Sequence, residues 1–136
     1  MTAGYSGKAL IEKLGLKEGF LARIVNAPDH YWALLGPLPP SVMLVDDETG
    51  DLDFIHCFVV RRDDLETKFP VLQTQLAQRG MFWVSWPKAA AKVATDLNEN
   101  IVRDIGLRNG LVDVKVCAVD AQWSGLKFVR RLKDRQ

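Results

Sequence analysis

The chain has 136 residues, the length of one ordinary domain, so we expect a single domain over residues 1–136 with no second core. Its 48% hydrophobic and 26% charged residues exclude disordered and fibrous classes. A formal net charge of +1 gives no field that would gather nucleic acid or an anionic membrane, and no apolar run approaches the roughly 20 residues of a membrane span. We therefore expect a cytoplasmic protein with neither partner.

The first predicted elements are a short helix and a buried strand. Three apolar residues at helical spacing predict the helix: Leu10, Ile11 and Leu14. Ser6 is its expected cap, and Gly15 its expected left-handed stop. The strand is predicted at residues 20–25, where the nearly continuous apolar run indicates burial on both faces.

A turn and a second helix follow this strand. Asn26, Ala27 and Pro28 form the turn, and we expect Asp29 to cap a helix that ends at Gly36. A stiff proline-rich connection then leads to a short strand at residues 42–45. That strand ends at an acidic tip, Asp46 and Asp47.

The middle of the chain predicts another strand and helix pair. The apolar run 54–60 hardly alternates, which indicates a third parallel strand. Asp63 and Glu66 resemble a capping box, and Pro70 is expected to kink the helix that follows. One apolar stripe marks that helix before Gly80: Leu65, Phe69, Leu72 and Leu76.

The last third predicts a strand, a helix and a hairpin. The strand is residues 81–86, and Thr95 is the expected cap of a helix that ends at Gly106. Residues 112–118 alternate between apolar and polar, as in an edge strand, and a short turn leads to a final strand at 123–130. The sequence therefore predicts an α/β fold of three layers, a Rossmann-like, mainly parallel sheet with helices on both faces and a C-terminal antiparallel hairpin.

This layout, with an acid after the second strand, resembles the class I S-adenosylmethionine-dependent methyltransferase fold in shortened form. The chain between Asp46 and Phe54 is too short for a further helix and strand, so one βα unit of the full fold is expected to be missing. Several strings also resemble a bacterial family of unknown function: Tyr5-Ser6-Gly7-Lys8, Leu34 to Pro39, Trp86-Pro87-Lys88, Ala94 to Leu97, Lys115 to Asp120, and Trp123 to Leu126. That second resemblance implies relatives without an established activity.

The methyltransferase resemblance implies a glycine-rich cofactor loop after the first strand, but the matching residues here are Asn26 to Asp29. Pro28 lacks an amide donor, and Asp29 is expected to occupy the helix end. The acid that holds the ribose of the cofactor in that family is matched by Asp46. We therefore expect the ribose-binding acid to remain while the glycine-rich loop is lost. S-adenosylmethionine is the only candidate cofactor, and no cofactor is established.

Ligands of open α/β sheets collect beyond the carboxyl ends of the parallel strands. This rule selects the candidate ligand-binding residues Asn26, Asp46, Arg61, Trp86, Lys88 and Asp96, with Arg62 and Thr95 beside them. The simpler alternatives are surface ion pairs of Arg61 and Arg62 with Asp63, Asp64 or Glu66, and a helix start at Thr95 and Asp96. Trp86 is either a core residue or a stacking floor beside Lys88.

Other reactive side chains predict structural roles. Cys57 and Cys117 are expected to be free, buried thiols, and no metal site is expected. The acidic residues between 46 and 53 are best interpreted as a solvated turn. His30 is either a packing residue or a titrating group beside Asn26, and Lys115 and Asp120 are a possible hairpin pair.

The leading functional hypothesis is a degenerate, non-catalytic methyltransferase-like domain that binds a small polar ligand or a protein partner. One such partner would be a second copy of the chain, bound through the C-terminal hairpin as a homodimer. The alternative is an S-adenosylmethionine-dependent methyltransferase with an atypical pocket, in which Asp46 holds the ribose and Asn26 replaces the glycine loop. A third hypothesis is an anion or nucleotide binder that uses Arg61 and Lys88.

Overall fold

The computed structural model describes residues 9–135, so the predicted cap at Ser6 and the string 5–8 lie outside the described part of the chain. The helices are α1 (Leu10–Leu14), α2 (Tyr31–Leu35), α3 (Arg62–Gln73) and α4 (Glu99–Arg108), with short 3₁₀ turns at Ala89–Ala91 and Leu132–Asp134. The strands are β1 (Leu21–Val25), β2 (Met43–Leu44), β3 (Leu52–Phe58), β4 (Leu76–Pro87), β5 (Leu111–Ala118) and β6 (Trp123–Arg130).

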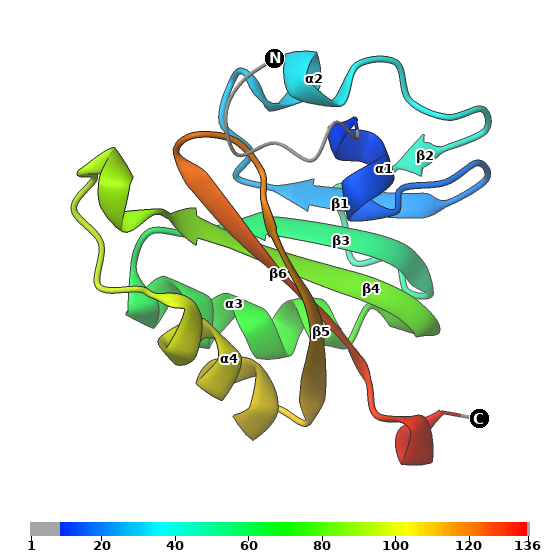
Figure 1. Cartoon of the computed structure of the whole chain (residues 1–136). Coiled ribbons are helices and arrows are strands. Elements are labelled where there is room, and N and C mark those ends of the chain that lie inside the picture. Colours follow the sequence, from blue (N-terminus) through cyan, green and yellow to red (C-terminus); the bar gives the residue numbers. More distant parts are fainter. Residues whose placement is uncertain (1–8, 136) are drawn as a thin grey trace.

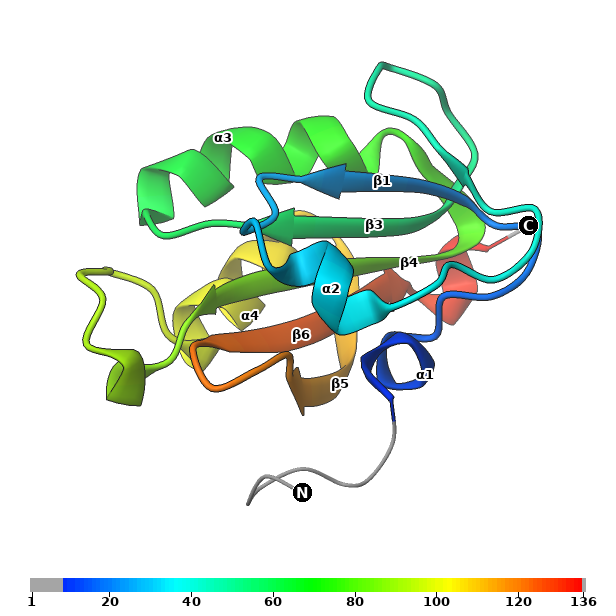
Figure 2. The ribbon, with the colours of Figure 1, turned by 90° about the horizontal axis from the view of Figure 1, so that it is seen from above.

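The six strands form one sheet in the order β2-β1-β3-β4-β6-β5. The first four of these are parallel, and β6 runs antiparallel to both β4 and β5. In Figure 1, α1 and α2 lie on one face of the sheet and α3 and α4 on the other. Viewed from above in Figure 2, the central strands run side by side between α3 and α2. The predicted three-layer fold with its terminal hairpin is therefore confirmed.

Each face of the sheet carries its own apolar core. On the α3 and α4 face, the Phe69 ring stacks on Phe82 at a centroid distance of 4.7 Å and meets Phe128 edge to face at 5.3 Å. On the α1 and α2 face, Trp83 is fully buried and its Nε1 donates a hydrogen bond to the carbonyl oxygen of Leu14 at 2.8 Å. The carbonyl end of α1 is thereby fixed to the middle of β4.

Glycines set two of the helix features. Gly15 ends α1 in the left-handed conformation, with φ 79°, as predicted. Gly106, by contrast, does not end its helix, which continues to Arg108. A Cβ atom at Gly106 would lie 2.0 Å from Cε1 of Phe128, so the glycine permits close contact between α4 and β6.

Three of the predicted helix starts are wrong in detail. The residue before α2 is His30 rather than Asp29, and no side chain caps that helix. The cap of α4 is Asn98, whose side chain accepts a hydrogen bond from the Ile101 amide, rather than Thr95. Helix α3 begins at Arg62 without the predicted capping box of Asp63 and Glu66. The stripe of that helix also ends early, because Leu76 is the first residue of β4.

The connection from β2 to β3 contains no helix, as expected from its length. Polar contacts secure it to the sheet instead. Arg23 of β1 donates hydrogen bonds from Nη1 to Gln75 Oε1 at 2.6 Å and to the Asp47 carbonyl at 3.0 Å. Gln75 Nε2 in turn donates to the carbonyl oxygens of Asp47 and Thr49. A buried glutamine therefore stabilises this loop where a longer fold would place another βα unit.

A polar chain crosses the α1 and α2 face of the core. The Tyr31 hydroxyl lies 2.8 Å from His56 Nδ1, and His56 Nε2 lies 2.8 Å from the Ser85 hydroxyl. All three side chains are inaccessible to solvent. Burial lowers the pKa of His56 to about 3 and raises the pKa of Tyr31, so both groups are neutral at pH 7. Because neither solvent nor a ligand can reach these side chains, their hydrogen bonds stabilise the core.

The two cysteines and the edge strand β5 agree with most of what the sequence predicts. Cys57 and Cys117 are free, as predicted, and only Cys57 is fully buried. β5 lies at the sheet edge and exposes Val114 and Val116, the position that the predicted dimer would use; that dimer stays a prediction. Among residues 9–135, no helix is long and apolar enough to cross a membrane, and no three potential metal ligands gather.

Candidate functional site

The carboxyl ends of the four parallel strands carry the predicted site residues in a row. Asp46 follows β2, Asn26 follows β1, Arg61 follows β3 and Lys88 follows β4. Because neighbouring strands lie about 4.8 Å apart, the two ends of this row are separated by roughly 14 Å. The sheet therefore places these residues along one edge without gathering them into a single pocket.

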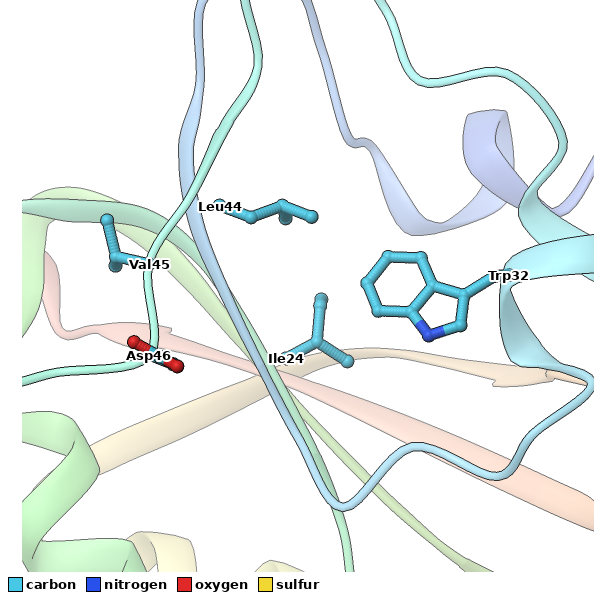
Figure 3. Close-up of a pocket in the computed structure, with 5 residues that line it drawn as sticks. All are labelled: Ile24, Trp32, Leu44, Val45 and Asp46. Carbon is cyan, nitrogen blue, oxygen red and sulfur yellow. The ribbon is translucent and has the colours of Figure 1, made fainter.

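A cavity of about 290 Å³ opens at the β2 end of this row. It is lined by Ile24, Trp32, Leu44, Val45 and Asp46. In Figure 3 the indole of Trp32 and the side chains of Ile24 and Leu44 point toward a common space, and Asp46 lies at the end of β2. Trp32 is 44% exposed, so one side of its ring is open to a ligand. The cavity combines apolar walls, an aromatic ring and one carboxylate.

The turn after β1 has a backbone geometry that normally favours glycine. Asn26 adopts a positive φ of 58°, and asparagine is one of the few other residues that tolerates it. The Pro28 carbonyl accepts a hydrogen bond from the Tyr31 amide, which closes the turn. The N-cap position of α2 is His30 and no side chain caps this helix, so the predicted cap by Asp29 is wrong.

A histidine and an aspartate meet at the same edge of the sheet. His30 Nε2 lies 2.6 Å from Asp120 Oδ2, and the other carboxylate oxygen of Asp120 accepts the amides of Gln122 and Trp123 at 2.8 Å each. The Asp120 side chain is 12% exposed and that of His30 is 45% exposed. A nearly buried carboxylate thus orients an accessible imidazole.

The pairing of His30 with Asp120 differs from what the sequence suggested for both residues. Asp120 does not pair with Lys115, whose Nζ instead donates a hydrogen bond to the Lys13 carbonyl at 2.9 Å. The pair spans 90 positions, so no local spacing reveals it. The only sequence signal is that both residues lie in or close to predicted turns at the carboxyl edge of the sheet. His30 lies in the turn after β1, and Asp120 lies in the turn of the β5–β6 hairpin.

The two arginines after β3 form surface ion pairs, one of the two readings that the sequence allowed. Arg61 Nε lies 3.3 Å from Asp63, with both side chains more than 70% exposed, and Arg62 Nε lies 3.5 Å from Glu66. Exposed pairs of this kind contribute little to stability. Arg61 therefore remains accessible at the edge, although nothing in the described part of the chain positions a ligand against it.

The loop between β4 and α4 folds over the end of β3. Asp96 Oδ1 accepts the backbone amide of Arg62, the first residue of α3, at 2.7 Å. The Thr95 hydroxyl donates to the Val60 carbonyl and accepts from the Leu97 amide. Asp96 thus satisfies one of the free amides at the start of α3, with a charge that suits a helix N-terminus. Both side chains have structural partners in the positions where the sequence predicted a ligand.

Trp86 and Lys88 separate at the end of β4. Trp86 is 5% exposed and belongs to the apolar core on the α3 and α4 face of the sheet, so it offers no face to a ligand. The Lys88 amide donates to the Gln122 carbonyl at 2.8 Å, which joins the end of β4 to the hairpin turn. The half-buried side chain of Lys88 lies near the hairpin. There its charge opposes the rise in the pKa of the Cys117 thiol that burial causes. The predicted stacking floor of Trp86 is therefore absent, while Lys88 stays at the edge.

Comparison with solved structures identifies the fold. A TehB-like SAM-dependent methyltransferase from Corynebacterium glutamicum is similar at a TM-score of 0.58 with 11% identity, over 95% of this chain and 91% of that one. Magnesium protoporphyrin IX methyltransferase from Synechocystis PCC 6803, with bound SAH, gives 0.55 with 12% identity over 90% and 78%. A SAM-dependent methyltransferase from Aquifex aeolicus gives 0.57 with 14% identity over 88% and 86%.

These likenesses establish the fold and leave the activity open. The chain has the Rossmann-like fold of class I SAM-dependent methyltransferases, at identities too low to carry function. No family model matches the sequence, and no curated protein matches it either. The resemblance to a bacterial family of unknown function therefore stays a hypothesis.

Proposed function

We propose that this chain binds S-adenosylmethionine or S-adenosylhomocysteine through the nucleoside, in the cavity lined by Trp32 and Asp46. The observation that carries this proposal is one opening at the carboxyl edge of the sheet that is lined by an aromatic ring, three aliphatic side chains and an aspartate. An adenine ring packs on a flat apolar surface, and a carboxylate accepts hydrogen bonds from ribose hydroxyls. Three of the similar solved structures contain bound SAH or SAM.

The size and chemistry of the cavity support a nucleoside better than a larger ligand. Its volume of about 290 Å³ lies just below the roughly 300 to 1,000 Å³ found for small-ligand sites. The amino-acid end of the ligand would extend along the turn that begins at Asn26. Pro28 supplies no amide there, so this end gains fewer backbone hydrogen bonds than a glycine-rich turn offers. The nucleoside is thus the part of the ligand that the chain recognises.

Calorimetric titration with S-adenosylhomocysteine tests the proposal. We expect binding by the unmodified chain, and a loss of about tenfold or more in Asp46→Asn, because a hydrogen bond to a charged acceptor contributes roughly 1.5 to 3 kcal/mol. Trp32→Ala should weaken binding by a similar factor, since it removes the stacking surface. Thermal denaturation of each variant would show that the fold is intact.

Asp51→Asn is the matched control for the carboxylate. Asp51 lies on the same loop, is exposed and does not line the cavity, and its positive φ of 57° suits asparagine. This control should keep the affinity of the unmodified chain. Absence of binding by the unmodified chain, or equal affinity in Asp46→Asn and Asp51→Asn, would contradict the proposal.

Methyl transfer is a second candidate function, favoured by the pair of His30 and Asp120. An accessible imidazole held by a carboxylate can accept the proton that an O–H or N–H acceptor loses as it gains a methyl group. His30 lies two residues before Trp32 of the cavity, and Asp120 lies in the turn between β5 and β6 at the same edge of the sheet.

Incubation with S-adenosylmethionine labelled in its methyl group, together with a lysate of the source organism, tests this second function. We expect incorporation of label that falls at least tenfold in His30→Gln while S-adenosylhomocysteine still binds. Binding without any incorporation would leave the ligand-binding domain as the correct description. Equal incorporation by the His30→Gln variant would exclude His30 as the base.

A further inference from the structure

Lysines from three separate segments meet on the sheet face that carries α1. Lys115 of β5 and Lys127 of β6 are directly opposite each other in the hairpin register. Lys13 lies in α1 and its carbonyl accepts the hydrogen bond from Lys115, while Lys17 is close enough to lower the pKa of Lys127. We refer to Lys13, Lys17, Lys115 and Lys127 as the lysine cluster.

Lys127 is the centre of the cluster and is held in place. Its Nζ lies 5.8 Å from the centroid of the buried Trp83 ring, a cation–π contact that fixes the ammonium group over β4. Partial burial, followed by the charges of Lys115 and Lys17, lowers the pKa of Lys127. Lys115 and Lys17 therefore add positive charge around the ammonium group of Lys127.

In the described part of the chain, Lys17, Lys115 and Lys127 have no carboxylate close enough to neutralise them. Within residues 9–135, no ion pair joins Lys17, Lys115 or Lys127 to a carboxylate, although eight ion pairs form elsewhere in that part of the chain. Like charges directly opposite each other in a hairpin destabilise it. The contact of Lys115 with the end of α1 accounts for one of these lysines, because a cation there meets free carbonyls. It does not account for Lys127 on the neighbouring strand.

Cys117 lies beside the same lysines. It lies two residues beyond Lys115 on β5, and burial raises the pKa of its thiol. The charges that lower this pKa all belong to lysines, namely Lys13, Lys115, Lys127 and Lys88. Four cations therefore act on one half-buried position, which lies on the way from the cluster to the carboxyl edge of the sheet.

We propose that the lysine cluster binds a small phosphorylated ligand through its phosphoryl oxygens. A phosphoryl group carries up to two negative charges on a compact set of acceptors, and ammonium groups bind it as point charges. One such group between Lys115 and Lys127 would convert their repulsion into two charge-assisted hydrogen bonds. Lys17, which follows α1, would meet a second phosphoryl group. This site is separate from the nucleoside cavity and does not depend on it.

Titration with pyrophosphate at constant ionic strength, maintained with sodium chloride, tests the proposal. We expect the unmodified chain to bind pyrophosphate and the double variant K115Q/K127Q to bind it at least tenfold more weakly, because two charge-assisted contacts are lost. The control K92Q/K133Q removes the same net charge from two other exposed lysines and should bind like the unmodified chain. Equal affinity in the two double variants would overturn the proposal.

Thermal denaturation of the same proteins separates binding from folding. Without pyrophosphate at low salt, K115Q/K127Q should melt about 2 to 4 °C higher than the unmodified chain, because the opposed charges are gone. A lower melting temperature would mean that the lysines stabilise the fold and would overturn the repulsion on which the proposal depends. Tighter binding of a DNA oligonucleotide than of pyrophosphate would also overturn it, in favour of a phosphate polymer.

Discussion

Gly106→Ala should lower the free energy of unfolding by about 2 kcal/mol, although alanine is the better helix former. Gly106 lies inside α4, where alanine gains roughly 1 kcal/mol of helix propensity. The new methyl group would lie 2.0 Å from the Phe128 ring, which is fully buried and packs edge to face on Phe69. The ring cannot retreat without disturbing that core, so the steric term exceeds the propensity term.

Urea denaturation of Gly106→Ala, Phe128→Leu and the double variant measures this effect. The double variant should be more stable than the sum of the two single changes predicts, because the smaller side chain makes room for the methyl group. Leu107→Ala is the control, since this neighbouring side chain is 39% exposed and its loss should change stability little. Additive single effects would show that the strain lies elsewhere than at Phe128.

Acid should destabilise the protein through His56. The folded pKa of about 3 lies far below the ordinary value of 6.5, so the unfolded chain binds a proton between these values and the folded chain does not. The contribution to stability is complete above pH 6.5 and is lost as the pH falls toward 3, at about 1.4 kcal/mol per pH unit. Between pH 7 and pH 5 the expected loss from this residue is about 2 kcal/mol.

The slope of unfolding free energy against pH isolates His56 from any general loss of stability in a variant. His56→Gln keeps a polar group toward Ser85 and removes the titration, so the mean slope between pH 5 and 6.5 should decrease by about 1 kcal/mol per unit. His30→Gln changes the other histidine of the chain and should retain the contribution of His56 to the slope. Equal slopes in the unmodified chain and His56→Gln would contradict the prediction.

The order of helices and strands could be predicted because each rests on local patterns. Continuous apolar runs marked the parallel strands, and the alternation from Val112 onward marked the edge strand β5. The helix starts were less accessible, because their partners are distant in sequence. Asp96 caps α3 from 34 positions away, and this contact replaced the expected capping box at Asp63. The leucine spacing continued through Leu76 although the backbone had already become a strand.

The candidate site was predicted in outline for a similar reason. The rule that ligands gather at the carboxyl ends of parallel strands selected Asp46, which lines the cavity. It did not select Trp32, because a residue in the helix after β1 shows no sign in the sequence that its ring faces β2. Nor did it reveal that Trp86 belongs to the core, since an aromatic residue at a strand end is compatible with either role.

The position of β6 also governs when the protein can fold. This strand is made last, yet it lies between β4 and β5 and contributes Phe128 to the core beneath α3 and α4. A nascent chain that ends before β6 has no partner for the free edge of β4 and lacks part of its apolar core. Domains generally fold as cooperative units during synthesis. The sheet can therefore close only after the ribosome has released the residues up to Arg130, and until then the exposed edge of β4 is the segment most in need of protection from aggregation.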